Sequence, residues 1–363
     1  MADFPETPWQ DLGYWQKRKK DKWRRMPAPV LVCPVVDTHC HLDTLSDPAY
    51  ALARAACLGV GELCTISDPT ESYDITFDAL DSWIADARNK AAFLVGMSQD
   101  FALPGVMDTV DETEYLGRWN EAFAISSGGS CSMVVGEDTL EQGKVPSVPK
   151  VHIGIGCHPH NARLYTDEVE GLIRERCKDS RVAVIGEIGL DYHYDLSPHE
   201  TQRECFRRQL RLAHELSMPV ALHVREAHDE ALEILSEEGF PEKGVLLHCC
   251  SLSPDEVKPW VEAGCWIAYG GPITFANGDD ARAGACCVPL DRLLTETDSP
   301  YMTPVPLRGV ACLPDYVAFN AERLASVVAS HRGIDETRAL KAFAENAQSF
   351  LNQGPFPCQA PLS

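Results

Sequence analysis

The sequence has no apolar run that approaches the roughly 20 residues needed to cross a bilayer. Its first ten residues, MADFPETPWQ, are polar and aromatic, whereas a secretory signal would be apolar. The 15 cysteines include no Cys-x-x-Cys pair, and an odd number cannot be fully paired in disulfides. We therefore expect a cytoplasmic protein with free thiols. Among these, Cys40, Cys157 and Cys249 lie in apolar runs typical of buried strands.

Positive charge is also scarce. The 363 residues include 32 Lys and Arg against 54 Asp and Glu, which gives a formal net charge of −22. This balance argues against a protein that neutralises many phosphates with its whole surface. However, residues 17–25 read KRKKDKWRR, with seven cations and one acid, so the other 25 cations and 53 acids carry −28. Any affinity for polyanions must therefore be local.

What the sequence does contain is a series of short apolar runs, each followed by a stretch of helical character. The runs begin near Val32, Val60, Val151, Val182, Pro219, Gly244, Cys265 and Leu293. Such alternation is typical of βα units on a parallel sheet. Eight units over roughly 250 residues predict the α/β class and a closed (β/α)₈ TIM barrel.

Two segments stand apart from this repeat. Residues 1–30 contain three Trp and end in the Pro-containing MPAPV, so we expect an N-terminal arm followed by a barrel over residues 31–363. The basic arm either holds single-stranded nucleic acid by charge and stacking or is a solvated or helix-packed surface element. The second connection of the barrel is long enough for an insertion at about residues 90–149. Such insertions are often lids or binding loops, but length alone leaves the role open.

The strongest local signal for chemistry is VVDTHCHLD. Its His39 and His41 stand two apart at the end of the first expected strand, so both side chains project to the same face. A lone buried His is usually structural. A His-x-His pair at this place is more typical of a metal site, because neutral imidazole suits Zn, Mn or Fe.

Four further polar residues interrupt later apolar strands at their C-terminal ends. They are Glu187 in VAVIGEIGLD, His223 in PVALHVRE, His248 in VLLHCC and Asp298 in LLTETDSP. Burying such side chains without partners is costly, and in a parallel barrel all C-terminal strand ends meet on the face that carries catalytic residues. We therefore expect one cluster that binds metal. The alternative is an internal polar network without metal.

Together these motifs resemble the TatD-type DNases of the amidohydrolase superfamily, over roughly residues 33–352. The order of the family is kept by DTHCHLD, GIGCHPHNA, VAVIGEIGLDYHYD, PVALHVREAH, VLLHCC, LLTETDSPYM and ENAQSFL. The resemblance implies a metal-dependent hydrolase of phosphodiester bonds that uses two, or as many as three, divalent ions of Mg, Mn or Zn. It also implies two ligand sets that share Glu187 as a bridge. These are His39, His41, Glu187 and Asp298 for one ion, and Glu187, His223 and His248 for the other.

By the same resemblance, Asp298, Glu187 and His158 are catalytic, with an activated water between the ions and Asp298 managing its proton. Two ions about 4 Å apart generate a nucleophile near neutral pH. The net charge of such a centre is about +1, because two divalent ions outweigh two carboxylates and a hydroxide while the four imidazoles are neutral. This local charge suits an anionic substrate in spite of the acidic chain.

Further residues are expected to bind substrate. His158 and His160 follow the third expected strand in GIGCHPHNA, and the resemblance places His158 near the scissile phosphate or a third metal position. Arg225 is suited to fork onto a phosphate, although an ion pair with Glu226 or Asp229 is the alternative.

Two acids next to the expected ligands are candidates for orienting roles. Asp191 follows Glu187 by four residues and is expected to orient a ligand histidine or the substrate, and Asp37 to do the same from the first strand. The alternative for both is a hydrogen-bonded loop residue.

One segment departs from the family. After TETDSPYMTP the family carries a basic, Asn-Pro-containing segment beside the substrate, but this chain reads VPLRGVACLPDYV and keeps only Arg308 and Pro314 of that character. The departure leaves the metal chemistry untouched. The departure leaves open whether the chain binds polymeric DNA or a smaller phosphoester.

We predict a TatD-like deoxyribonuclease of the 3′-5′ exonuclease type, whose partner is DNA or another phosphoester and not a membrane. One alternative is an amidohydrolase-like enzyme that opens a small ester, amide or lactone. That superfamily usually bridges its metals with a carboxylated Lys or a Glu, and Glu187 within GEIGLD favours the TatD type. The other alternative is a catalytically weak scaffold that binds a protein. The sequence leaves the oligomeric state open.

Overall fold

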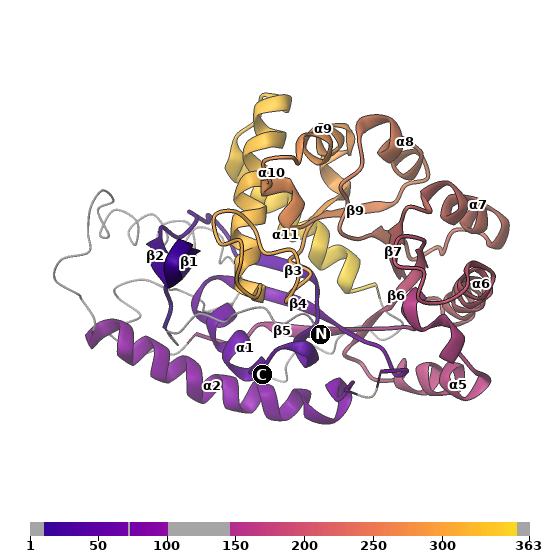
Figure 1. The fold of residues 1–363 in the computed structure, drawn as a ribbon, viewed down its shortest axis with the longest axis horizontal. Coiled ribbons are helices and arrows are strands. Elements are labelled where there is room, and N and C mark those ends of the chain that lie inside the picture. The colour runs from indigo at the N-terminus through magenta and orange to yellow at the C-terminus, as the bar shows by residue number, and fades with distance from the viewer. Residues whose placement is uncertain (1–10, 72, 101–145, 354–363) are drawn as a thin grey trace.

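The computed structural model describes residues 11–71, 73–100 and 146–353 (Figure 1). Within them, eight parallel strands form one sheet in which each strand pairs with the next along the chain. These strands are β3 (Val35–Cys40), β4 (Val60–Ser67), β5 (Lys150–Ile155), β6 (Val182–Asp191), β7 (Val220–Arg225), β8 (Val245–Leu247), β9 (Trp266–Tyr269) and β10 (Leu293–Thr295). Each coincides with one of the apolar runs, so the expected βα repeat is confirmed.

The sheet closes on itself through its first and last strands. The Thr38 hydroxyl donates to the carbonyl of Thr295 at 3.0 Å, and the Thr295 hydroxyl donates to the carbonyl of Val36 at 2.9 Å. Beyond the strand ends, Cys40 and Ser299 form an isolated parallel bridge. These contacts make a nearly closed barrel, as the sequence predicts.

Helices cover the outside of the barrel. They are α1 (Pro48–Cys57), α2 (Thr76–Asp100), α5 (Asp167–Arg176), α6 (His199–Leu216), α7 (His228–Glu238), α8 (Pro254–Glu262), α9 (Asp279–Cys287), α10 (Val317–Arg332) and α11 (Glu336–Leu351). In Figure 1, α5 to α9 follow one another around the strands. Helix α6 shows why such a segment packs outside. Its Phe206 and Leu210 are fully buried, while its Arg207 pairs with Glu238 on α7.

Short side chains fill the barrel interior, where Ala183, Ala221 and Ala268 are buried with Val and Leu side chains. Phe350, at the end of α11, packs in the same cluster and lies 6.0 Å from Trp266 between ring centroids. Trp266 begins β9, so α11 plugs the end of the barrel where strands begin. The end where the strands finish is left for the site. None of the described helices is long and apolar enough to span a membrane.

The basic segment forms a hairpin of β1 (Tyr14–Arg18) and β2 (Lys22–Met26). The Tyr14 ring is buried and meets Phe319 of α10 edge-on, with 4.8 Å between centroids. The described part of the arm is thus a β-hairpin that packs against a helix, and its binding of nucleic acid stays a prediction.

The expected insertion lies largely beyond what the structure describes. Residues 90–100 continue α2, and residues 101–145 are outside the described ranges. The role of the insertion stays a prediction. Of the three cysteines expected in buried strands, Cys40 and Cys157 are fully buried and Cys249 is half-buried.

Candidate metal centre

His39 and His41 stand at the C-terminal end of β3, as the alternation of that strand requires. Each ring turns its Nε2 toward the carboxylates of Glu187 and Asp298. Nε2 of His39 lies 3.4 Å from Glu187 and 4.0 Å from Asp298, and Nε2 of His41 lies 3.8 Å and 3.5 Å from the same two groups. The two histidines expected to act together therefore converge on the two expected carboxylates.

Glu187 occupies the middle of the cluster, in the fully buried strand β6. Its Oε1 lies 2.6 Å from Nδ1 of His223 and 2.8 Å from Nε2 of His248, while its Oε2 faces His39 and His41. Burial alone would raise the pKa of this carboxyl, but the imidazoles of His248, His158, His39 and His223 outweigh burial and hold the pKa well below its usual range. Glu187 is therefore ionised, with one oxygen toward each half of the histidine set.

Asp298 reaches the cluster from just beyond β10. The strand ends at Thr295, three residues before the position expected from sequence, and Asp298 adopts a positive φ of 60°. Its backbone N–H donates to the carbonyl of His39 at 2.9 Å, which holds it against β3. Burial would raise the pKa of Asp298, but a hydrogen bond from His41 outweighs burial and lowers the pKa. The carboxylate is therefore ionised and can accept a hydrogen bond from a group beside it.

The donors fit a divalent metal. Ligand atoms of His39, His41 and Glu187 lie within 4.8 Å of one another, as do those of Glu187, His223 and His248. His39 is fully buried, yet neither ring nitrogen has a hydrogen-bond partner among the described residues. An unsatisfied buried polar group costs about 1–3 kcal/mol. Imidazole nitrogen suits Zn and carboxylate oxygen suits Mn or Mg, so a cation bound in the cluster would satisfy Nε2 of His39, which faces Glu187 and Asp298.

Asp191 lies beside the cluster rather than in it. Its Oδ2 is 3.0 Å from Nε2 of His223 and 2.9 Å from Nε2 of His160, and its Oδ1 accepts the N–H groups of His193 and Tyr194. Burial would raise the pKa of Asp191, but the hydrogen bonds from the two histidines outweigh burial and hold the pKa far below its usual range. Asp191 thus fixes the ring of His223 so that Nδ1 points at Glu187.

His158 projects into the centre from the loop after β5. Its Nδ1 accepts the backbone N–H of His160, at 3.1 Å, so a neutral ring carries its proton on Nε2. That nitrogen lies 3.7 Å from Oε1 of Glu187. Burial, with the nearby imidazoles, lowers the pKa of His158 well below its ordinary value and keeps the ring neutral. His158 thus offers a hydrogen-bond donor to an anion in the site.

Arg225 follows His223 by two residues and lines the opening of the barrel. None of the ion pairs of the described residues includes Arg225, and its neighbour Glu226 binds His193. Its guanidinium stacks on the ring of Tyr194, 4.8 Å from the centroid. Tyr194 is 55% exposed, so the stacked pair presents a flat cation and an aromatic ring to the opening.

Two acids of the site could not be assigned from sequence. Glu296 is fully buried, accepts the N–H of Cys249 at 2.6 Å and lies 3.6 Å from Nδ1 of His248. The signal for it was its place two residues before Asp298 in TETD. Asp68, at the end of β4, accepts the N–H of His158 at 3.0 Å.

Asp37 has a different role from the one expected. Its carboxylate accepts the backbone N–H and the hydroxyl of Thr297, at 2.8 Å and 2.6 Å. The hydrogen bonds recorded for its carboxylate go to Thr297 and, at 3.4 Å, to the backbone of His39, and none goes to an expected ligand side chain. Asp37 therefore holds the segment that carries Asp298 to β3.

The cluster lies at the bottom of a cavity of about 840 Å³. Among the described residues that line it, eight are acidic and Arg225 is the one Lys or Arg. Burial raises the pKa of Glu71 to about 7 and that of Asp43 to about 6. A cavity with this charge attracts cations and repels a phosphate until cations are bound.

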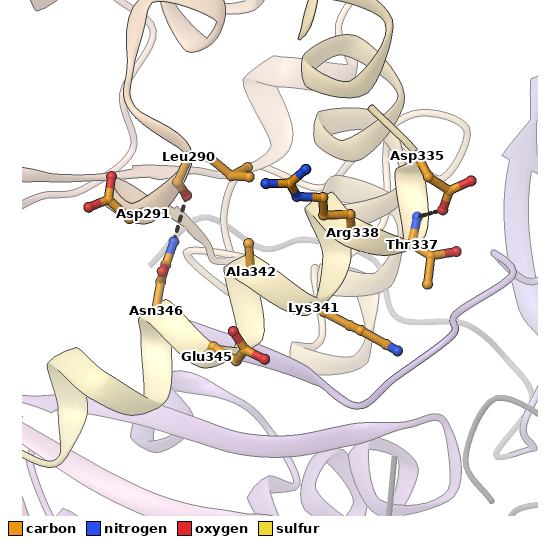
Figure 2. A pocket seen from close by; sticks show the side chains of 9 residues that line it. All are labelled: Leu290, Asp291, Asp335, Thr337, Arg338, Lys341, Ala342, Glu345 and Asn346. Atoms are coloured by element: carbon orange, nitrogen blue, oxygen red, sulfur yellow. Dashed lines mark hydrogen bonds between the residues drawn. The ribbon is translucent and has the colours of Figure 1, made fainter. Parts of the chain in front are cut away.

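A second hollow, of about 720 Å³, lies between α11 and residues 290–291 (Figure 2). Its Asn346 donates to the carbonyl of Leu290 at 2.8 Å, and Asp335 caps α11 by accepting the N–H of Thr337 at 2.7 Å. Its charges are of both signs, and none of its lining residues is a His or Cys. This hollow offers no set of groups that converge on a reacting atom.

Comparisons with known proteins agree with the fold. The family described as TatD related DNase matches residues 36–352. An uncharacterized metal-dependent hydrolase, YabD of Bacillus subtilis, is 38% identical over 177 residues, which are 49% of this chain and 69% of YabD. The 3′-5′ ssDNA/RNA exonuclease TatD of Pantoea vagans is 34% identical over 192 residues, which are 51% of this chain and 74% of that protein.

Among solved structures, the TatD homologue YJJV of Escherichia coli aligns with a TM-score of 0.61 and 22% identity, covering 89% of this chain and 99% of YJJV. At that identity the likeness establishes the shared barrel fold.

Proposed function

Because the chain belongs to the TatD-related DNase family, we propose that it is a divalent-metal-dependent phosphodiesterase that removes nucleotides from the 3′ end of single-stranded DNA. The observation that carries the proposal is the placement of Glu187, which turns one oxygen to His39 and His41 and the other to His223 and His248. This is the arrangement needed to share one carboxylate between two ions. The naming of the Pantoea vagans relative as a 3′-5′ exonuclease supports the substrate and direction.

In this proposal the two halves of the cluster hold separate ions. The first half is His39, His41, Glu187 and Asp298, and the second is Glu187, His223 and His248. Bound divalent ions, Mg, Mn or Zn, lower the pKa of water and withdraw charge from the oxygens of a phosphoester.

The chain itself then binds, orients and moves a proton. His158 donates from Nε2 to a phosphate oxygen, and Arg225 binds the same group while Tyr194 supports its guanidinium. Asp298 accepts the proton of the attacking water, whose oxygen forms the new bond to phosphorus. The bond from phosphorus to the 3′ oxygen breaks, and that oxygen takes a proton from solvent. Asp191 keeps His223 and His160 in place throughout.

A second candidate is the hydrolysis of a small phosphoester or carboxylic ester. The observation that favours it is the charge of the cavity, where Arg225 is the one Lys or Arg among the described lining residues. A polymeric anion needs more cationic contacts than the cavity supplies. Both candidate functions use the same metal centre. They differ in whether residues outside the cavity bind the rest of a polymeric substrate.

The test uses purified protein with Mg²⁺, Mn²⁺ or Zn²⁺ and a panel of substrates. These are 5′-labelled single-stranded DNA, duplex DNA, RNA, and small phosphate and carboxylic esters. We expect a ladder of DNA products that shorten from the 3′ end, and no ladder when that end is blocked by phosphorothioate linkages. Glu187→Gln is the matched control, because it removes the shared charge and little volume. Turnover of small esters alone would support the second candidate, and no metal-dependent hydrolysis of any substrate would leave a binding scaffold.

A further inference from the structure

The hairpin of β1 and β2 concentrates Lys and Arg side chains in one short surface segment. We call residues 14–26 the basic hairpin. Its exposed cations are Arg18, Lys19, Lys20, Lys22, Arg24 and Arg25. None of these six has a carboxylate at ion-pairing distance among the described residues. By contrast, several cations around the barrel are paired, as Arg174 is with Glu215 and Lys178 with Glu175.

The basic hairpin is fixed to the barrel. The guanidinium of Arg54, on α1, is buried against Asp315 at 2.8 Å and also donates to the carbonyls of Asp11 and Gly13. The Tyr14 hydroxyl donates to the carbonyl of Asp315 at 3.4 Å. The start of the basic hairpin is therefore anchored by hydrogen bonds and packing. The backbone that carries the cations keeps a fixed position on the surface.

That position is next to the opening of the barrel. The Gln16 amide donates to the carbonyl of Pro306 at 2.7 Å, in the loop that precedes α10 (Figure 1). Met302, which lines the cavity, precedes Pro306 by four residues. Consecutive Cα atoms are 3.8 Å apart, so Pro306 lies within about 15 Å of Met302. The basic hairpin thus packs against the loop that leads from the cavity to α10.

The two strands also place aromatic rings among the cations. Trp23 lies opposite Lys17, and Trp15 lies opposite Arg25. Paired residues of an antiparallel ladder share a face, so both Trp belong to one face together with two cations. Trp23 packs against the apolar cluster around Tyr14, so the cations are what the hairpin offers to a nucleic acid backbone, and charge selects no sequence.

We propose that the basic hairpin holds the phosphate backbone of a single-stranded nucleic acid whose 3′ end enters the barrel. The inference rests on the proposed function for the direction of the strand. The hairpin supplies the positive charge that the acidic cavity lacks, a few nucleotides away from the reacting phosphate.

The test measures binding without cleavage. A fluorescein-labelled 20-nucleotide oligo(dT) is titrated in EDTA at several salt concentrations, and anisotropy gives the slope of log K against log salt. The variant is Lys19→Gln, Lys22→Gln and Arg24→Gln together, and the matched control removes three exposed cations elsewhere, Lys243→Gln, Lys258→Gln and Arg338→Gln. Each lost contact to single-stranded DNA lowers the slope by about 0.7, so we expect a fall of about 2 and binding ~10- to 100-fold weaker at 0.1 M salt. The control should match wild type.

A slope equal to that of wild type in the hairpin variant would overturn the inference, as would equal losses in the variant and the control. Hairpin-dependent binding to phosphatidylserine vesicles without binding to the oligonucleotide would also overturn it. Thermal unfolding of all three proteins shows that each is folded. Hydrolysis of bis(p-nitrophenyl) phosphate by wild type, measured in parallel with Mn²⁺, tests the proposed function separately. Binding without hydrolysis would reject the nuclease and keep the hairpin.

Discussion

Nδ1 of His223 lies 2.6 Å from Oε1 of Glu187, while the other nitrogen of the same ring lies 3.0 Å from Asp191. The ring is therefore held between an acid of the cluster and an acid outside it. Because Asp191 also receives two backbone N–H groups, its position is fixed by the loop after β6. The direction in which His223 points is a property of that loop.

The first prediction separates metal binding from turnover. Glu187→Gln removes the charge that both halves of the cluster share, so we expect loss of both ions and of activity. The loss of metal affinity should exceed the ~10- to 100-fold that follows removal of an outer hydrogen-bond partner of a ligand. His158→Ala should retain metal and lose mainly kcat, because its Nε2 is placed as a donor to substrate. Elemental analysis of both variants is the measurement. Full metal occupancy in Glu187→Gln would show that this carboxylate does not bridge.

The second prediction concerns Asp298. Asn keeps nearly the same shape and one ligand oxygen but cannot take a proton, so Asp298→Asn should fold, keep most of its metal and lose ~10²- to 10⁴-fold in turnover. The measurement is the rate at saturating substrate over a range of Mn²⁺ concentrations. If excess Mn²⁺ restored the rate, activity would depend on occupancy alone, and Asp298 would be only a ligand.

The third prediction concerns Arg225. Lys keeps the charge, but it loses the planar guanidinium that stacks on Tyr194 and forks onto a phosphate. We expect Arg225→Lys to lower kcat/KM for DNA by about 10-fold, roughly the worth of one such contact, with unchanged metal content. Glu226→Gln is the control, since it lies next in sequence and binds His193 on the surface. An equal effect in both variants would point to a disturbed loop instead of a lost contact.

The fourth prediction is a pH dependence at the other end of the barrel. Oε2 of Glu62, on β4, lies 2.7 Å from Nε2 of His152 on β5. Burial would raise the pKa of Glu62, but the hydrogen bond and charge of His152 outweigh it and lower the pKa. A lowered pKa means that the carboxylate stabilises the fold above its unfolded value of about 4.5, and that this contribution is lost as the pH falls through the folded value.

We therefore expect Glu62→Gln to lower the free energy of unfolding by about 1–2 kcal/mol at pH 7, the range for a hydrogen bond to a charged group. The difference from wild type should shrink below pH 4.5. Urea unfolding at pH 7 and at low pH measures both. Glu175→Gln, in an exposed pair with Lys178, should have no measurable effect at either pH. A difference that stays constant with pH would mean that Glu62 contributes through packing and not through its charge.

The eight strands and the six converging residues could be predicted from sequence for one physical reason. A charged or imidazole side chain that ends an apolar run is costly to bury alone. Such a residue therefore indicates the end of a strand and the presence of a partner that several of these side chains share. His39 and Glu187 follow this rule, whereas Asp298 lies three residues beyond the end of β10. The structure adds which atoms face each other.

The rest depends on contacts that local patterns do not contain. Glu296 stands in the polar run TETD, and only the backbone path beyond β10 decides that it turns toward His248. Asp37 resembles an orienting acid in sequence, but it binds Thr297 from the far end of the chain. The basic hairpin was hidden because its many cations mask the alternation of Trp15 and Trp23 with polar residues.

The closure of the barrel sets an order on its assembly. Thr38 and Thr295, which join the first strand to the last, are 257 residues apart. A growing chain therefore displays His39 and His41 long before Asp298 exists to complete their half of the site. If that half holds an ion, as proposed, its full ligand set exists only after the last strand of the barrel has been synthesised. A chain that ends before the last strand would have His39 and His41 without Asp298, and these imidazoles could bind transition metals from solution.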